Sequence, residues 1–190
     1  MVILFITGEL RSGKDTAAEY LKNVLIKNNI HVETMAFSDP VRISLHAFGL
    51  PPERENYSSM CTAMKSAFGP NVLIRAITQH LVRLRGLKGV LILTGGRFLR
   101  DLDVLKGFSS LTVAITASEN VRFERSKNSP KDSCHTLAQF REANAALTEG
   151  EIQLLKRMCN TVLENNSNLS DFHAQLTGVV DCVIKLSALE

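Results

Sequence analysis

Short continuous apolar runs alternate with longer amphipathic stretches along most of this 190-residue chain. Continuous apolar runs are typical of strands that are buried on both faces of a parallel sheet. The predicted strands cover residues 2–6, 31–37, 89–93, 111–117 and 160–164. The stretches between them carry apolar residues three and four positions apart, which predicts helices that each present one face to the sheet. The alternation predicts a single α/β domain over residues 1–190, with a doubly wound parallel five-stranded sheet.

The first predicted helix begins at Lys14, and Asn28 and Asn29 are expected to end it. Further helical patterns cover residues 41–48, 58–68, 73–84, 100–106, 120–127, 136–147, 149–158 and 172–183. His80 lies in the apolar stripe of its helix, so we expect a packed core histidine there. The stretch between the second and third strands, about residues 39–88, is long enough to form a lobe that binds a second substrate.

The first predicted strand leads directly into a glycine-rich segment, GELRSGKDT, from Gly8 to Thr16. Gly8, four further residues, Gly13 and Lys14 match the phosphate-binding P-loop, whose backbone N–H groups cradle phosphates. Lys14 is expected to reach the outer phosphates, and the positive end of the following helix faces the anion. A chance glycine turn would not require a strand, a loop and a helix in this order. We therefore predict an ATP site that includes Gly8, Arg11, Ser12, Gly13, Lys14, Asp15 and Thr16.

Asp15 stands where a P-loop usually carries Ser or Thr, whose hydroxyl binds Mg²⁺. Asp15 could take this role as a carboxylate or through a water molecule, or the adjacent Thr16 could supply the hydroxyl. Both residues are therefore candidate metal ligands, and the expected cofactors are ATP and Mg²⁺.

Composition narrows the classes of partner. The net charge of +3 suits a small anionic ligand, and no block of basic residues interleaved with aromatic residues suggests nucleic acid. No apolar run reaches membrane-spanning length, and the first strand runs into the P-loop rather than a cleavage site. The cysteines are widely spaced, as in a reduced intracellular protein: Cys61, Cys134, Cys159 and Cys182. We expect a cytoplasmic monomer or homodimer without nucleic-acid or membrane partners.

Polar residues follow the carboxyl ends of the predicted strands, where ligands bind in open parallel sheets. The second strand leads to Asp39 and Arg42, the third to Arg97, and the fourth to Arg122 and Arg125. Phosphoryl transfer requires that phosphates are positioned and that cations balance the developing charge. Any one of these arginines could be a solvated surface charge, but their joint placement at strand ends favours a site.

The segment RSGKDTAAEYL resembles the P-loop of phage-type deoxynucleoside monophosphate kinases. It is also similar to the loop of animal-type phosphomevalonate kinases and, less closely, to that of dephospho-CoA kinases. All belong to the nucleoside-monophosphate-kinase-like group of P-loop kinases. This resemblance implies the strand order 2-3-1-4-5, with the P-loop after the central strand, and a short lid over about residues 120–135.

The resemblance extends to the acceptor side of the site. FSDPVR resembles the segment in which these kinases keep a polar residue near the acceptor. It implies Asp39 as base or acceptor orienter, with Arg42 one turn on; an N-cap of the next helix is an equal alternative for Asp39. FGPNVLIRAI resembles a stretch that supplies an acceptor-binding arginine, here Arg75. ILTGGRFLRDLD resembles the strand-then-arginine motif that places Arg97 near the acceptor or the transferred phosphate.

On the donor side, VRFERSK resembles the lid segment, in which Arg122 and Arg125 would clamp the donor phosphates. TVLENNSNLSDF is similar to the last strand and turn of these kinases, where the backbone around Asn165 and Asn166 lies beside the adenine. The catalytic set that the motif and the resemblance imply is Lys14, Asp39, Arg97, Arg122 and Arg125.

One position departs from the group. Relatives usually carry Asp near the end of the third strand, where this chain has Thr94, so metal binding would rest on Asp15, Thr16 or Asp39. The implied function is ATP-dependent transfer of the γ-phosphoryl group to a small metabolite, first a (deoxy)nucleoside monophosphate. Dephospho-CoA and phosphomevalonate are alternative acceptors. An ATP-binding regulatory protein with little or no transfer activity is the alternative from another class.

Overall fold

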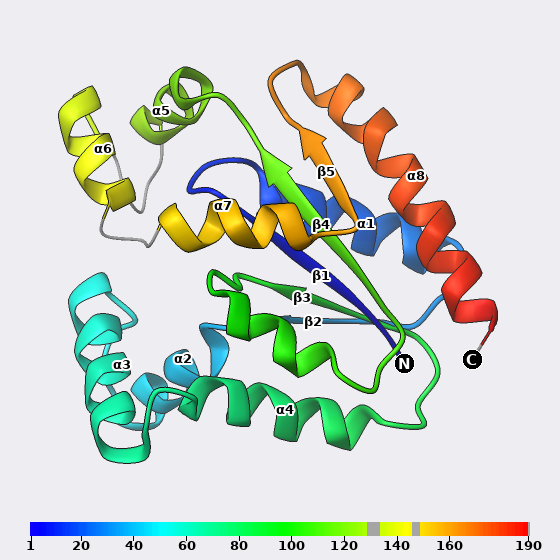
Figure 1. Cartoon of the computed structure of the whole chain (residues 1–190), viewed down its shortest axis with the longest axis horizontal. Helices are drawn as coiled ribbons and strands as arrows, with labels where there is room; N and C mark the ends of the chain where they lie inside the picture. Colours follow the sequence, from blue (N-terminus) through cyan, green and yellow to red (C-terminus); the bar gives the residue numbers. More distant parts are fainter. Residues whose placement is uncertain (129–133, 146–148, 190) are drawn as a thin grey trace.

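The computed structural model describes residues 1–128, 134–145 and 149–189, and a five-stranded parallel sheet lies at its centre (Figure 1). The strands are β1 (Val2–Gly8), β2 (Val32–Ala36), β3 (Val90–Thr94), β4 (Ser110–Thr116) and β5 (Thr161–Glu164). Their order is β2-β3-β1-β4-β5, and every neighbouring pair is parallel. The predicted doubly wound sheet and its strand order are therefore confirmed.

The helices lie close to their predicted positions. They are α1 (Lys14–Lys27), α2 (Asp39–Ala47), α3 (Arg54–Phe68), α4 (Val72–Leu84), α5 (Glu119–Lys127), α6 (Leu137–Ala145), α7 (Glu149–Met158) and α8 (Leu169–Ala188). The segment predicted as a helix at 100–106 is a 3₁₀ helix, η1 (Leu99–Leu105). Helix α3 begins at residue 54, four residues earlier than predicted. The prolines at 51 and 52 lie in the loop before the helix, and Glu53 is its N-cap with an extended backbone.

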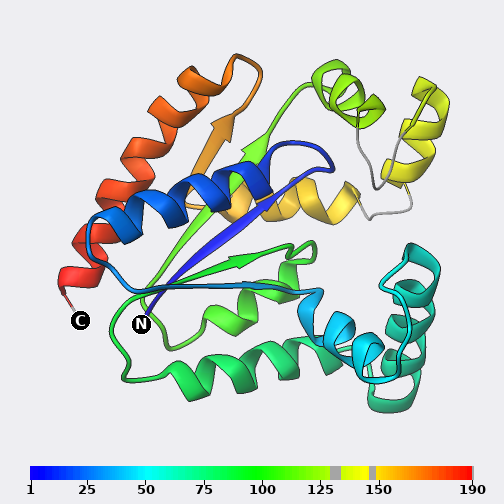
Figure 2. The same cartoon turned by 180° about the vertical axis from the view of Figure 1, so that it is seen from behind.

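Strand β1 is buried along its whole length and separates two cores. Successive strand side chains point to opposite faces, so Val2, Leu4 and Ile6 pack in the core beneath α1 and α8. Ile3 and Phe5 pack in the other core, beneath α4, η1 and α7. Figure 2 shows α1 and α8 along the first of these faces. The segment after β1 therefore extends from a strand that both cores hold in place.

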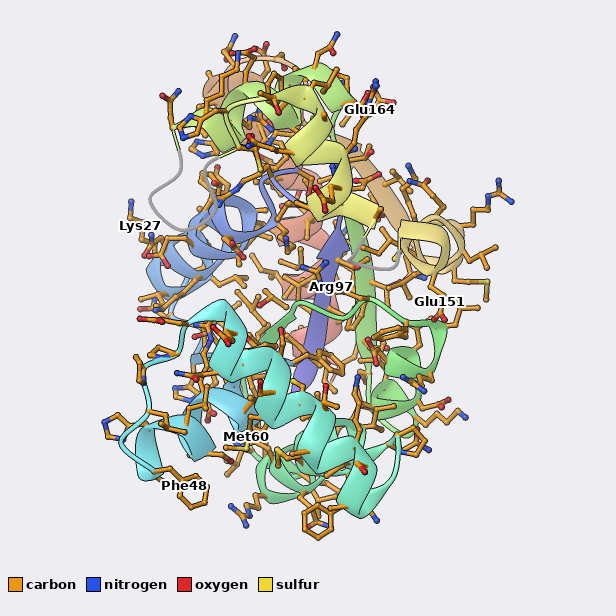
Figure 3. The ribbon with its side chains drawn as sticks, turned by 90° about the vertical axis from the view of Figure 1, so that its left-hand side faces the viewer. Lys27, Phe48, Met60, Arg97, Glu151 and Glu164 are labelled. Carbon is orange, nitrogen blue, oxygen red and sulfur yellow. The ribbon has the colours of Figure 1, made fainter. Side chains whose placement is uncertain are left out.

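The carboxyl ends of the strands lie at one edge of the sheet, where α2, α3, α5 and α6 gather (Figures 1 and 2). Figure 3 looks onto this edge. In open parallel sheets this edge is the usual place for a ligand. No helix within the described ranges is both long enough and apolar enough to span a bilayer.

Candidate functional site

The glycine-rich segment connects the carboxyl end of β1 to the start of α1. Gly8 and Gly13 have φ angles of 151° and 101°, and Arg11 between them has a φ of 62°. A Cβ atom on Gly8 would lie 2.1 Å from the carbonyl oxygen of Ile115, and one on Gly13 would lie 2.2 Å from Nδ2 of Asn165. Both positions therefore require glycine, for backbone conformation and for close approach.

Lys14 is the first residue of α1 and is half-buried at the end of this segment. Burial lowers the pKa of its ammonium group, and the nearby charges of Arg97 and Arg11 lower it further. The carboxylate of Asp15 acts in the opposite direction. Burial therefore makes the charged form of Lys14 less favourable, and a bound anion would offset this desolvation cost.

Asn165 and Arg125 form hydrogen bonds to main-chain carbonyls of the glycine-rich segment. Nδ2 of Asn165 donates to the carbonyl of Ser12 at 2.9 Å. Nη2 of Arg125 donates to the carbonyl and Oδ1 of Asn165 at 3.0 and 3.1 Å, and its Nη1 donates to the carbonyls of Arg11 and Ser12 at 3.4 Å. Asn166 Oδ1 accepts from the backbone N–H of Ser118 at 2.7 Å. These bonds connect the segments that follow β1, β4 and β5.

Arg122 lies on α5, the helix that also carries Arg125, and it too donates to main-chain oxygens. Its Nε donates to the carbonyl of Ala117 at 3.1 Å, and its Nη1 donates to the carbonyl of Leu10 and to Oδ1 of Asn144, both at 3.3 Å. The guanidinium lies 5.6 Å from the ring centroid of Phe140. Residues 120–127 of the predicted lid thus belong to a packed helix, and 129–133 fall outside the described residues. That these arginines clamp donor phosphates stays a prediction.

We expect Arg125→Ala to lower the free energy of unfolding by about 1–3 kcal/mol, since hydrogen bonds from a charged donor to partly buried carbonyls are lost. Urea denaturation of the ligand-free protein measures the change. Arg141→Ala is the matched control, because Arg141 forms an exposed ion pair with Glu119 at 2.9 Å and should affect stability little. Equal losses in the two variants would rule out the bracing role of Arg125.

A cavity of about 200 Å³ lies between α1, α2 and the ends of β2 and β3. Its lining includes Asp15, Asp39 and Thr94. Oδ2 of Asp39 accepts from the backbone N–H of Ala36 at 2.6 Å, while Ser38 occupies the N-cap position of α2. The carboxylate of Asp39 therefore turns back to the end of β2, and the alternative in which it caps α2 is wrong.

The cavity residues fit Mg²⁺ in chemical type. Mg²⁺ prefers oxygen ligands and is usually held by one or two carboxylates together with substrate phosphates and water. Asp15, Glu19 and Asp39 supply three carboxylates, and Thr94 adds a hydroxyl. Among the described residues no group of three or more His, Cys, Asp or Glu could hold a metal ion by itself. Thr16 is exposed on α1 and does not line the cavity.

The loop after β3 presents Arg97. Oδ2 of Asp101 accepts from the backbone N–H groups of Arg97 and Phe98 at 2.7 and 3.0 Å, so a buried carboxylate fixes the turn. Burial raises the pKa of Asp101. Figure 3 shows Arg97 in front of the end of β1, between α3 and α6. Asp101 was not among the predicted site residues, although its position four residues after Arg97 is a local signal of a capped turn.

The other two candidate acceptor residues lie farther out. Arg42 is exposed on α2. Nη2 of Arg75 donates to the carbonyl of Phe68 at 2.6 Å, so Arg75 fixes the turn between α3 and α4. The structure gives Arg75 this role at the turn, and its binding of an acceptor stays a prediction.

Glu9 was also missed. It is buried within the glycine-rich segment, and its Oε1 accepts from Thr116 Oγ1 and Gln153 Nε2, both at 3.2 Å. Nζ of Lys156 lies 3.5 Å from the same oxygen. Glu9 thus joins the segment to α7. The motif leaves this position unspecified, so the sequence offered no signal for it.

The sequence matches no family model, and it matches no curated protein. Solved structures share the fold over nearly the whole chain. A shikimate kinase from Bacteroides thetaiotaomicron is 12% identical with a TM-score of 0.63, covering 96% of this chain and 98% of that one. A Mycobacterium tuberculosis APS kinase in complex with AMPPNP and APS is 15% identical with a TM-score of 0.57, covering 95% and 96%.

A shikimate kinase from Acinetobacter baumannii in complex with shikimate is 14% identical with a TM-score of 0.54, covering 96% of this chain and 93% of that one. At these identities the likeness establishes the fold. The chain therefore has the α/β fold of these small-molecule kinases.

Proposed function

We propose that this chain is an ATP-dependent phosphotransferase that moves the γ-phosphoryl group to a small metabolite. The observation that carries the proposal is the position of Lys14. It begins α1 after the loop that follows the central strand, and the next residue, Asp15, lines a cavity together with the carboxylates of Glu19 and Asp39. This is the arrangement that phosphoryl transfer needs, in which cations balance charge on the phosphates beside a site for Mg²⁺.

The residues divide into donor and acceptor groups. The backbone from Gly8 to Thr16 and the side chain of Lys14 would bind the donor phosphates, with the turn at Asn165 and Asn166 beside the adenine. Arg97, Arg122 and Arg125 would supply further positive charge. Asp39 would orient the acceptor and receive its proton. Asp15 and Asp39 would hold Mg²⁺, and the ion would supply positive charge that neutralises the phosphates.

The acceptor that we favour is a (deoxy)nucleoside monophosphate, with dephospho-CoA and phosphomevalonate as alternatives. The segment from Asp39 to Lys88 would form the acceptor lobe and residues 120–135 the lid. The structural neighbours widen the choice, because two of them are complexes that contain shikimate or APS. All of these molecules are small and anionic, which suits the arginines around the site.

An acceptor panel tests the function. The protein is incubated with ATP, Mg²⁺ and each nucleoside monophosphate, dephospho-CoA, phosphomevalonate, shikimate or APS, and phosphorylated product is measured against a control without acceptor. We expect product from one class of acceptor. ATP loss that does not depend on an acceptor would indicate an ATPase, and ATP binding without turnover would indicate a regulatory protein.

Thr94 motivates the rival function of an ATP-binding regulatory protein, because the expected carboxylate of the third strand is absent. We expect Thr94→Asp to leave transfer similar or higher, since Asp15 and Asp39 already line the same cavity. Thr34→Asp is the matched control, because it adds a carboxylate to this cavity from β2. Transfer by Thr94→Asp combined with none by the wild type would contradict our proposal and support the regulatory protein.

A further inference from the structure

Glu9 places a negative charge inside the segment that we expect to bind phosphates. Its side chain is buried, and it follows Gly8, the first residue of the segment. The backbone N–H of Ser12 donates to the Glu9 carbonyl at 3.2 Å, so Glu9 belongs to the turn itself. A carboxylate repels phosphates, and a protein interior screens this repulsion less than water does. A phosphate site built on this turn therefore needs a cation that offsets Glu9.

Helix α7 supplies a cation at this carboxylate. It packs against β1, the strand that leads into the segment (Figure 1). Nζ of Lys156 lies 3.5 Å from Oε1 of Glu9 and donates to Oγ1 of Thr116 at 3.5 Å. Gln153, one turn earlier on α7, donates to the same carboxylate oxygen at 3.2 Å. The other oxygen, Oε2, is buried and has no hydrogen-bond partner within the described part of the chain. The negative charge of Glu9 thus meets its counter-ion on one side only.

The charge of Glu9 also acts where the outer phosphates are expected. Burial lowers the pKa of Lys14, and Glu9 is one of the two carboxylates that act in the opposite direction. A group that stabilises the Lys14 cation destabilises an anion bound beside that cation. The balance of charge between Glu9 and Lys156 therefore affects phosphate binding as well as the fold.

We propose that Lys156 sets the affinity of the glycine-rich segment for the donor nucleotide by neutralising Glu9. This inference rests on the proposed function, since it concerns the donor phosphates of the same reaction. Lys156 is a positioning residue, because the group that it contacts is Glu9 and it acts on the nucleotide through that group. The two charges have opposite effects on a bound anion: Glu9 weakens its binding, and Lys156 strengthens it.

The sign of the effect separates charge balance from support of the fold. AMPPNP with Mg²⁺ is titrated into each folded variant, and Kd is measured by calorimetry. We expect Lys156→Met to raise Kd on the order of tenfold, because Glu9 then repels the phosphates without its counter-ion. Glu9→Gln should lower Kd by a smaller factor, because the Lys156 side chain is 25% exposed and water screens its charge. If the pair only supported the fold, both variants would raise Kd.

Three further variants complete the test. Glu9→Gln combined with Lys156→Met removes both charges and should return Kd close to the wild-type value. Lys156→Arg keeps the positive charge and should retain the wild-type Kd. Arg157→Met is the matched control, because it removes an exposed cation from the next position of α7 and should leave Kd unchanged. A raised Kd in Glu9→Gln, or an unchanged Kd in folded Lys156→Met, would overturn the inference. Should Lys156→Met fail to fold, the sign measured for Glu9→Gln decides.

Kinetics with the acceptor found by the panel give a second readout. KM for ATP should follow the Kd for AMPPNP across these variants, while KM for the acceptor changes little. An acceptor KM that rose in step with that for ATP would indicate a general loss of structure and contradict the inference. AMPPNP binding with the expected signs but no phosphorylated acceptor would support the inference and contradict the proposed transfer. A wild type that binds no AMPPNP would contradict both.

Discussion

Replacing Lys14 with methionine should reduce phosphoryl transfer on the order of 10²–10³ while leaving the folded protein at least as stable as the wild type. The rate falls because a positive charge that would stabilise the transition state is lost. Stability is preserved because burial lowers the pKa of Lys14, which shows that the fold holds this charge at a cost. Turnover with saturating ATP and urea unfolding of the same preparation measure the two effects.

The stability effect has a defined pH dependence. The pKa of Lys14 is lower in the folded state than the ordinary lysine value of 10.5, so between the two values the unfolded chain binds more protons. Wild-type stability therefore rises with pH through that window, and the advantage of Lys14→Met should shrink as pH approaches 10.5.

Lys27→Met is the matched control for Lys14, because Lys27 is exposed in the last turn of the same helix. This variant should retain wild-type turnover. A folded Lys14→Met protein with the turnover of the control would show that the glycine-rich segment does not bind donor phosphates.

Asp39→Asn should lower transfer by about 10²-fold or more, since it removes a proposed base and one of the three carboxylates that line the cavity. The asparagine oxygen can still accept from the N–H of Ala36, which preserves the local turn. Mg²⁺ titrations at several pH values separate the two roles: a lost metal ligand raises the Mg²⁺ requirement, whereas a lost base alters the pH profile.

Asp103→Asn is the matched control for Asp39→Asn, because it removes a carboxylate that does not line the cavity. Asp103 is exposed and pairs with Lys106 at 2.8 Å on η1. Its replacement should leave transfer unchanged. If Asp39→Asn matched it in turnover and in Mg²⁺ requirement, Asp39 would have no part in the reaction.

The sequence predicted those features that depend on neighbouring residues. Continuous apolar runs identified β1 and β3 because strands buried on both faces have no polar side. Gly8, Gly13 and Lys14 were recognisable because close approach to phosphate fixes their spacing. Periodicity carries no information on strand order. The order was predicted correctly only because of the resemblance to a kinase group.

Features that depend on distant segments were not predictable in this way. Sequence showed the charge of Arg125 but not that its partners are carbonyls more than a hundred residues earlier in the chain. Capping preferences left Asp39 undecided, and its bond to Ala36 appears only when β2 and α2 are placed. His80 was expected in the core, but its side chain is 36% exposed and lies 3.7 Å from Glu33, because that part of α4 meets the edge strand β2.

The pair formed by Glu9 and Lys156 limits how this sequence can evolve. Loss of the Lys156 charge would leave the buried Glu9 carboxylate without its counter-ion, which is a costly state. A single substitution at Lys156 would therefore be selected against, although no motif of the sequence marks that position. Replacing both residues with neutral ones should therefore destabilise the fold less than replacing Lys156 alone.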